Sequence, residues 1–319
     1  MKIELCKYLN GAPAAFSFTF DDGCYYDSSS EILEIFEDVY KKTGVKFKGT
    51  VGITVGFMHQ RLIDFWRNGI KNGYFDISSH SVNHDIAYTA QTPYEKRLWD
   101  AKESKAQLQK MFEGEPVDTY IYAGGARDDE GKKALDGLYI AARGNNDGIN
   151  LPGKIDWLDI SCFTALLKRT TKEYTDYIDK TISNGGWGVQ MNHWITSKTE
   201  DTFHAQNAKT FFEECHYLGR RASNGEVWVG SFNEVARYLW RAENSTLSVT
   251  KNDDEYSVRI TPRSNDNTQK YDTPLTILVN SATPIELILE NGKGEKICPR
   301  NGKIYINIMD EARFRLLPY

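Results

Sequence analysis

The strongest constraint on the fold is an alternation of strand-like and helix-like segments that runs to about residue 243. Short apolar runs of strand length are separated by amphipathic stretches, of which SSSEILEIFEDVYKKTG, ending at Gly44, is the clearest. Repeated strand–helix units favour a parallel sheet, and seven or eight of them commonly close into a barrel. The seven predicted strands are residues 15–20, 47–54, 74–79, 119–123, 138–142, 187–192 and 226–230.

The pattern changes after residue 243, where short strand-like segments follow one another with turns of Asn, Asp, Gly and Pro between them. No helical periodicity is evident in this part of the sequence. We therefore expect an α/β protein with a distorted seven-stranded (β/α) barrel at residues 1–243 and a small all-β sandwich at residues 244–319. The second segment is too short for a second enzyme, so any chemistry is expected in the barrel.

Composition excludes several classes of protein. The 319 residues carry a net charge of −5 without a prominent basic run, which argues against a nucleic-acid partner. Five cysteines without CxxC spacing argue against a disulfide framework and a structural zinc knuckle. No apolar run approaches the length of a membrane span. The first residues show no signal peptide, so we expect either a cytoplasmic protein or one whose leader was trimmed.

Two adjacent carboxylates end the first predicted strand in the sequence TFDDG. Asp21 and Asp22 repel each other and would be costly to bury side by side. One interpretation is a solvated turn, because Asp-Gly is a common turn dipeptide. The other is that a cation lies there, or that the two acids have different chemical roles. The carboxyl ends of barrel strands are where catalytic residues gather, which favours the second interpretation.

Three histidines also follow predicted strands. His80 and His84 come directly after the third one, and a spacing of four would place both rings on one face of a helical turn, where they could share a metal ion. The alternative is that one caps a neighbouring group and the other is incidental. With Asp22 as third ligand, two histidines and a carboxylate leave a position for water, which is typical of a hydrolytic site. His193 follows the strand at 187–192; it would face the same mouth, or be an ordinary buried histidine.

These motifs, in this order, resemble the polysaccharide deacetylases, the NodB-homology proteins of carbohydrate esterase family four. The resemblance is carried by TFDDG, by HSVNH at residues 80–84 and by the strand-end histidine, and it extends to the closing EVWVGSFNEVARYL. It covers about residues 13–240. It implies a metal-dependent hydrolase that removes N- or O-acetyl groups from an acetylated polysaccharide or oligosaccharide.

The resemblance also implies a role for each residue of the site. Asp21 matches the catalytic base and His193 the catalytic acid. Asp156 and Trp157 match an Asp-Trp motif, with Asp156 orienting the acid and Trp157 near the substrate; Asp159 is a rival for the orienting role. A divalent ion, zinc by expectation and cobalt or nickel as alternatives, would be held by Asp22, His80 and His84.

The third motif departs from the family. Where the family has Arg-x-Pro-Tyr-Gly, residues 121–125 read IYAGG, so the arginine and the proline are absent. The arginine is the usual partner of the base, and Arg127 or Arg143 could replace it. In the turn formed by Gly124 and Gly125, the backbone N–H of Gly124 could bind the oxyanion.

Two other functions remain open at this point. The chain could be a carbohydrate-binding protein on a catalytically impaired deacetylase scaffold, or it could act on a small amide that is not a sugar. The retention of every expected metal ligand, of the base and of the acid favours the enzyme acting on an acetylated glycan.

Overall fold

The structure is a computed structural model that describes residues 1–197, 205–263, 272–289 and 293–317. The chain divides into two compact units. The larger unit consists of residues 13–236, and the smaller one combines residues 1–12 with residues 237–319. We describe each unit by itself.

A parallel sheet forms the centre of the larger unit. Its strands lie in the order β6-β5-β4-β3-β2-β8-β7, and β11 pairs with β2 outside this row. All of these strand pairs are parallel, as strand–helix alternation predicts. The bounds are β2 (Ala15–Phe20), β3 (Gly49–Ile53), β4 (Phe75–Ser79), β5 (Thr119–Ile121), β6 (Ala141–Arg143), β7 (Phe163–Thr164), β8 (Trp187–Asn192) and β11 (Trp228–Val229).

The row of strands curls into a distorted barrel, in which the end strands β6 and β7 are linked, among the described residues, only through the residues just before β7. A parallel bridge joins Arg143, at the end of β6, to Ile160, just before β7. The Ile160 N–H donates to the Ala142 carbonyl at 2.8 Å, and the Gly144 N–H donates to the Ile160 carbonyl at 3.1 Å. The expected barrel is thus confirmed, with one change: the row contains the very short β7, whereas the segment predicted at 226–230 forms β11.

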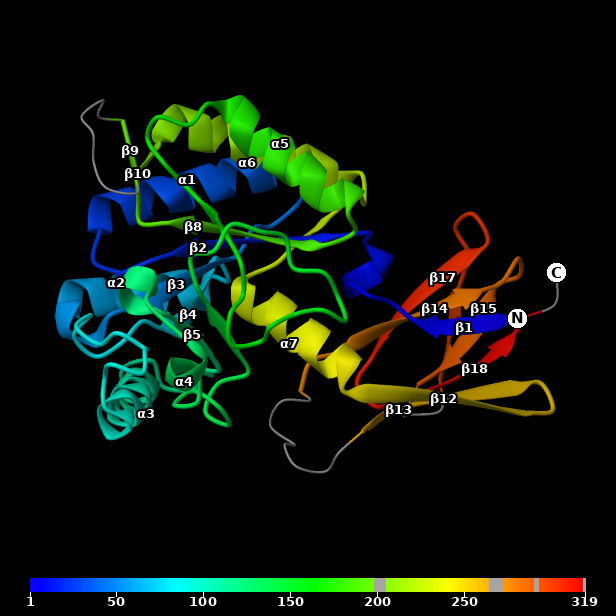
Figure 1. Ribbon diagram of the computed structural model, residues 1–319. Coiled ribbons are helices and arrows are strands. Elements are labelled where there is room, and N and C mark those ends of the chain that lie inside the picture. The colour runs from blue at the N-terminus through cyan, green and yellow to red at the C-terminus, as the bar shows by residue number, and fades with distance from the viewer. Residues whose placement is uncertain (198–204, 264–271, 290–292, 318–319) are drawn as a thin grey trace. The chain divides into compact units, whose positions relative to one another are not determined.

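Helices cover the outside of this sheet (Figure 1). Helices α1, α5 and α6 pack side by side over β2 and β8, while α2 and α3 pack against β4. Gly44 ends α1 with a φ of 71°, the left-handed conformation expected of a terminating glycine. None of the described helices is long and apolar enough to cross a membrane. The bounds are α1 (Tyr26–Thr43), α2 (Gln60–Lys71), α3 (Tyr94–Met111), α4 (Asp129–Lys132), α5 (Thr171–Ser183), α6 (Ala208–Ser223) and α7 (Phe232–Glu243).

The alternation of side chains along β2 explains why Asp21, the first of the two adjacent acids, faces the interior at the mouth of the barrel. Successive side chains of a strand point to opposite faces. Phe18 packs against Phe36 of α1 and Phe211 of α6, so this face of the strand meets the helices. Ser17 faces the other way and accepts a hydrogen bond from the indole of a tryptophan in β8. The same alternation carries Asp21 to the interior face, at the carboxyl end of the strand.

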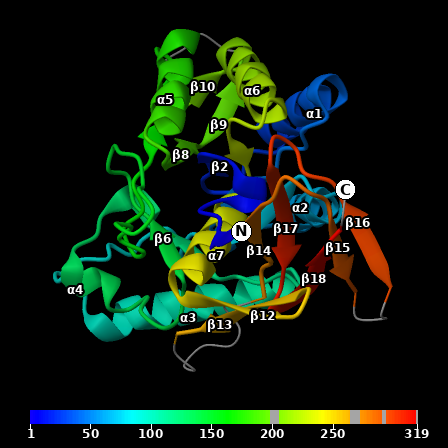
Figure 2. The same ribbon diagram turned by 90° about the vertical axis from the view of Figure 1, so that its right-hand side faces the viewer.

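The smaller unit contains two antiparallel sheets, whose strands are best seen in Figure 2. Their strand orders are β1-β14-β17 and β12-β13-β18-β15-β16. Every second side chain of β17 is buried, as expected of a strand that faces a core on one side. The all-β character expected here is confirmed. The bounds are β1 (Lys2–Leu5), β12 (Ser245–Asn252), β13 (Glu255–Pro262), β14 (Leu275–Asn280), β15 (Ile285–Ile288), β16 (Gly294–Ile297), β17 (Lys303–Ile308) and β18 (Glu311–Leu316).

The observed division of the chain differs from the expected one near both ends of the barrel. Strand β1 pairs with β14, with Lys2 opposite Asn280, so residues 1–12 belong with the smaller unit. Helix α7 runs across the division at residues 236 and 237. That residues 1–243 form a catalytic domain and residues 244–319 an accessory domain stays a prediction.

Candidate active site

The carboxyl end of β2 turns sharply at Asp22 and Gly23. Both residues adopt left-handed backbone conformations, with φ of 72° and 71°, which aspartate tolerates better than most residues. The Gly23 N–H donates to the Asp21 carbonyl at 2.9 Å, and the indole of Trp66 donates to the Gly23 carbonyl at 2.9 Å. Because of this turn, the two adjacent carboxylates point in different directions and meet different partners.

The segment from His80 to His84 is a loop, so the prediction of a helical turn was wrong. Ser81 and His84 have φ of 76° and 62°, which interrupts any helix. The loop is held from behind by Asp100 of α3, which is fully buried. Its Oδ1 accepts hydrogen bonds from the Ser81 hydroxyl at 3.0 Å and from the Val82 N–H at 2.8 Å. The left-handed backbone conformations of the loop therefore bring the two imidazoles together, and the buried carboxylate of Asp100 stabilises that loop.

Asp22, His80 and His84 come together at this edge of the sheet. Asp22 Oδ1 lies 3.5 Å from His80 Nε2 and 3.7 Å from His84 Nε2. On a tetrahedral zinc ion with bonds of about 2.0–2.1 Å, two ligand atoms would lie about 3.3–3.4 Å apart. Asp22 Oδ1 and His80 Nε2 are buried without a hydrogen-bond partner among the described residues. Such unpartnered atoms fit a divalent cation held between them.

Neighbouring groups orient two of these three side chains. His80 Nδ1 lies 2.8 Å from the carbonyl of Ile121. Because a carbonyl can only accept, Nδ1 carries the proton and Nε2 of the neutral ring keeps its lone pair for a metal. The hydroxyl of Tyr25 donates to Asp22 Oδ2 at 3.2 Å, so the other oxygen, Oδ1, is the one that faces the histidines.

Asp21 meets a different partner. One terminal nitrogen of Arg143 donates to both of its carboxylate oxygens. Both side chains are almost completely buried, with 4% of Asp21 and 1% of Arg143 exposed. Of the two arginines that could replace the missing arginine of motif three, Arg143 is therefore the one that contacts Asp21.

The electrostatics of the two carboxyls follow from these contacts. Burial alone would raise the pKa of Asp21, but the charge of Arg143 and its hydrogen bonds to the carboxylate hold it below its usual value. Burial would likewise raise the pKa of Asp22, and the two histidines and His193 around it, His80 first, outweigh this and lower it. Both groups are thus ionised at neutral pH.

A small cavity of about 110 Å³ opens between these groups. His193, the residue after β8, lines it together with Asp21 and both histidines of the loop. Gly124 and Gly125 form another part of the wall, and both have left-handed φ, at 64° and 72°. The described residues that line the cavity are Asp21, His80, His84, Tyr122, Gly124, Gly125, Arg143, Asn145, Thr164, Met191 and His193.

Comparison with known proteins identifies the fold. No family model matches the chain, and no curated protein matches it. Among solved structures, a putative polysaccharide deacetylase from Mycobacterium smegmatis superposes with a TM-score of 0.54, over 78% of this chain and 98% of that one. The chain has the polysaccharide deacetylase fold. The two sequences are 13% identical, so the likeness shows the fold alone.

Two further structures with the deacetylase fold match at lower TM-scores. A CE4 esterase from Streptococcus mutans is 13% identical with a TM-score of 0.47, over 69% of this chain and 86% of that one. A CE4 family pseudoenzyme from Bacillus anthracis is 11% identical with a TM-score of 0.45, over 70% of this chain and 65% of that one.

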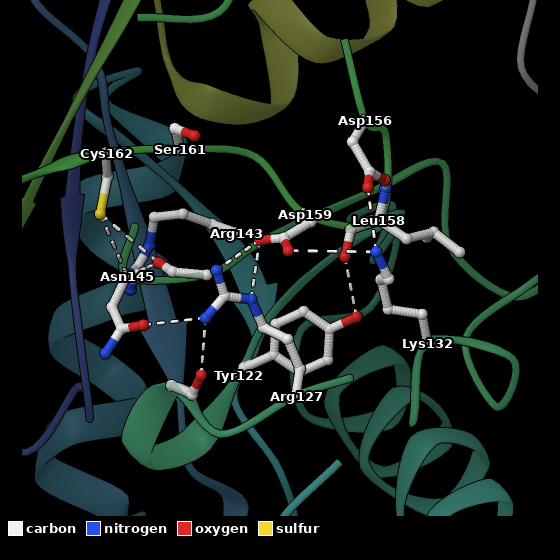
Figure 3. Close-up of polar contacts among 12 residues, drawn as sticks. Tyr122, Arg127, Lys132, Arg143, Asn145, Asp156, Leu158, Asp159, Ser161 and Cys162 are labelled. Carbon is white, nitrogen blue, oxygen red and sulfur yellow. Dashed lines mark hydrogen bonds and ion pairs between the residues drawn. The ribbon is translucent and has the colours of Figure 1, made fainter. Parts of the chain in front are cut away.

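Asp156 and Trp157, the expected Asp-Trp motif, are not among the described residues that line the cavity, and Figure 3 shows Asp156 beside Lys132. The side chain of Asp156 is 56% exposed and accepts a hydrogen bond from Lys132 at 2.9 Å. Asp159 accepts one from Arg127 Nε at 2.7 Å. The described residues that line the cavity include neither acid, nor Trp157. The structure therefore does not place Asp156 where it would orient His193; its carboxylate is engaged by Lys132 instead.

Sequence reasoning missed several supporting residues. Asp100 left a weak signal, since it lies on the same stripe of helix α3 as Ala101, Ser104 and Leu108, where an apolar side chain would be expected. A buried acid on such a stripe needs donors, and here it receives them from the metal-site loop and from two tyrosine hydroxyls. Tyr25 left no signal, because its role depends on which distant group it meets.

Proposed function

We propose that the protein is a metal-dependent hydrolase that removes acetyl groups from an acetylated polysaccharide or oligosaccharide. The observation that carries the proposal is the meeting of Asp22 with His80 and His84, which leaves two buried ligand atoms without a hydrogen-bond partner among the described residues. Two histidines and one carboxylate suit zinc, with cobalt or nickel as alternatives. The deacetylase fold agrees with this reaction.

Asp21 is the proposed general base. A divalent ion held by the three ligands would polarise a carbonyl group and acidify water. Arg143 keeps Asp21 ionised, so that this carboxylate can accept a proton from water. Both of its oxygens contact Arg143, but a carboxylate has about four lone-pair sites and can still accept a further hydrogen bond.

His193 is the proposed general acid. It lines the cavity with Asp21, so one group can receive a proton while the other supplies one to the departing nitrogen or oxygen. The turn at Gly124 and Gly125 forms another wall of the same cavity, where a backbone N–H could stabilise the developing negative charge.

A binding protein on an impaired deacetylase scaffold is the alternative. Its main support was the missing arginine of motif three, which would have left the base without a partner. The contact between Arg143 and Asp21 removes that reason, because the carboxylate has a buried cationic partner. The departure from the family motif therefore does not by itself argue for lost catalysis.

The test measures metal content and acetate release on the same protein. We expect close to one divalent ion per chain and release of acetate from at least one member of a panel of N- and O-acetylated glycans. The double variant His80→Ala/His84→Ala should lose both the ion and the activity. Asp21→Asn should keep the ion and lose turnover by roughly 10²–10⁴-fold. Glycan binding with bound metal but no acetate release would favour the alternative.

A further inference from the structure

The side chain of Asn145 forms part of the cavity wall and lies directly against Gly125. A side chain at Gly125 would displace Asn145, because a Cβ there would lie 2.4 Å from Asn145 Nδ2 and 2.5 Å from its Cγ. The amide of Asn145 therefore packs onto the bare backbone of the glycine turn. The amide is thus a polar group beside residues 121–125, the segment that corresponds to motif three of the deacetylases.

The chemistry of its neighbour fixes the orientation of this amide. Oxygen and nitrogen of an asparagine are ordinarily hard to tell apart, and the hydrogen-bond network must decide between them. Here Asn145 Oδ1 lies 2.8 Å from NH1 of Arg127. A guanidinium group can only donate, so the oxygen must face Arg127, and Nδ2, a donor, is left for the other side.

Arg127 is itself held in place. Its Nε donates to Asp159 at 2.7 Å, and its NH1 also donates to the carbonyl of Gly125 at 2.8 Å. Gly144 lies directly beneath it, since a Cβ there would be 2.1 Å from Arg127 Cζ. One guanidinium thus contacts both the glycine turn and the amide of Asn145. Figure 3 shows its contacts with Asn145 and Asp159.

We propose that Asn145 is a substrate-binding residue whose Nδ2 group donates a hydrogen bond to an oxygen of the acetylated substrate in the cavity. The inference rests on the proposed function. Arg127 acts as a positioning residue. The cavity, of about 110 Å³, is lined by the proposed base and the proposed acid, so the part of the substrate that it receives is the acetyl group that reacts. Its wall includes Met191 and Tyr122, which offer apolar surface to a methyl group, while the amide offers a donor to the oxygen beside it.

The first experiment compares three variants at matched metal content. Asn145→Asp keeps an oxygen for Arg127 and removes the donor, and Asn145→Ala removes both without adding charge. Asn146→Asp adds the same charge one residue further on, at a position outside the cavity wall. We expect kcat/KM for an acetylated substrate to fall about tenfold or more in both Asn145 variants and to stay near the wild-type value in Asn146→Asp. Wild-type kcat/KM in either Asn145 variant overturns the inference.

A second readout does not require turnover. Acetate carries the acceptor oxygens of the proposed ligand, and its affinity for the full-length protein can be measured by NMR titration. We expect Asn145→Ala to weaken acetate binding about tenfold. Unchanged affinity, or no binding of acetate to the wild-type protein, overturns the inference. If the wild type releases no acetate from any glycan, the proposed function fails, while this titration still decides the role of Asn145.

The role of Arg127 is tested through its coupling to Asn145. Arg127→Met should weaken acetate binding more in the wild-type background than in the Asn145→Ala background, because part of its effect passes through the amide. Arg127→Lys should restore part of the loss, since a lysine still offers a donor to Asn145 Oδ1. Equal effects of Arg127→Met in both backgrounds would mean that Arg127 has only a structural role.

Discussion

At the scale of single residues, the two neighbouring acids differ because the backbone turns between them. Asp21 continues the alternation of β2 into the barrel and meets Arg143. Asp22 has a left-handed φ and faces His80 and His84 instead. The two adjacent residues can thus have different roles, because Asp21 has a cationic partner and Asp22 has metal-binding partners.

Loss of Arg143 should affect both stability and activity. Arg143→Met leaves Asp21 buried without its cationic partner, and breaking a buried pair in this way costs about 3–5 kcal/mol of unfolding free energy. Thermal denaturation and kcat with an acetylated substrate measure the effect. Arg67→Met is the control, since that guanidinium pairs with Asp64 on the exposed surface of the same unit. Equal losses of stability in the two variants would contradict a special role for Arg143.

Tyr25 should raise the affinity for metal, although it is not itself a ligand. Its hydroxyl donates to Asp22 Oδ2, which directs Oδ1 towards the histidines. Removal of such an outer partner typically weakens metal binding 10–100-fold, so we expect this loss in Tyr25→Phe. Competition with a zinc chelator measures it, and Tyr26→Phe, the same change one residue on, should leave the affinity as in the wild type. Unchanged affinity in Tyr25→Phe would refute the role.

At the scale of elements, a buried carboxyl lies between strand β8 and helix α6. Glu214 is fully buried and accepts hydrogen bonds from Gln206 at 2.6 Å and Gln190 at 3.2 Å. Burial raises its pKa to about 8, and the two amides only partly offset this. Glu214 Oε1 and Gln190 Oε1 are both buried without a partner among the described residues. A proton on Glu214 would turn one of these two acceptors into a donor.

The raised pKa of Glu214 predicts a pH dependence of stability. The folded-state pKa of Glu214 lies above the unfolded value. Its contribution to the free energy of unfolding is therefore fully present below the unfolded pKa of about 4.3 and is lost as pH rises through about 8. Glu214→Gln should therefore gain stability relative to the wild type between pH 5 and pH 9. Chemical denaturation across that range measures the gain, with Glu213→Gln as control. A constant difference at all pH values would contradict the prediction.

At the scale of the whole molecule, the metal site belongs to the larger unit. Its ligands and supporting residues all lie within residues 13–236. We therefore expect a fragment of residues 13–243, which keeps α7 intact, to bind one divalent ion with wild-type affinity. Metal analysis and circular dichroism of the fragment provide the measurement. A folded fragment that binds no metal would show that the smaller unit is required.

Local patterns in the sequence were sufficient for the parallel barrel, for the all-β segment and for the strand ends where the site residues lie. Strand and helix periodicities repeat within a few residues, and parallel strands bring their carboxyl ends to one edge. Only the tertiary structure showed that Arg143, and not Arg127, is the partner of Asp21. It also showed that Asp156 does not line the cavity and how the amide of Asn145 is oriented. Those outcomes depend on which groups meet after chain segments far apart in sequence have packed, and no local pattern encodes that.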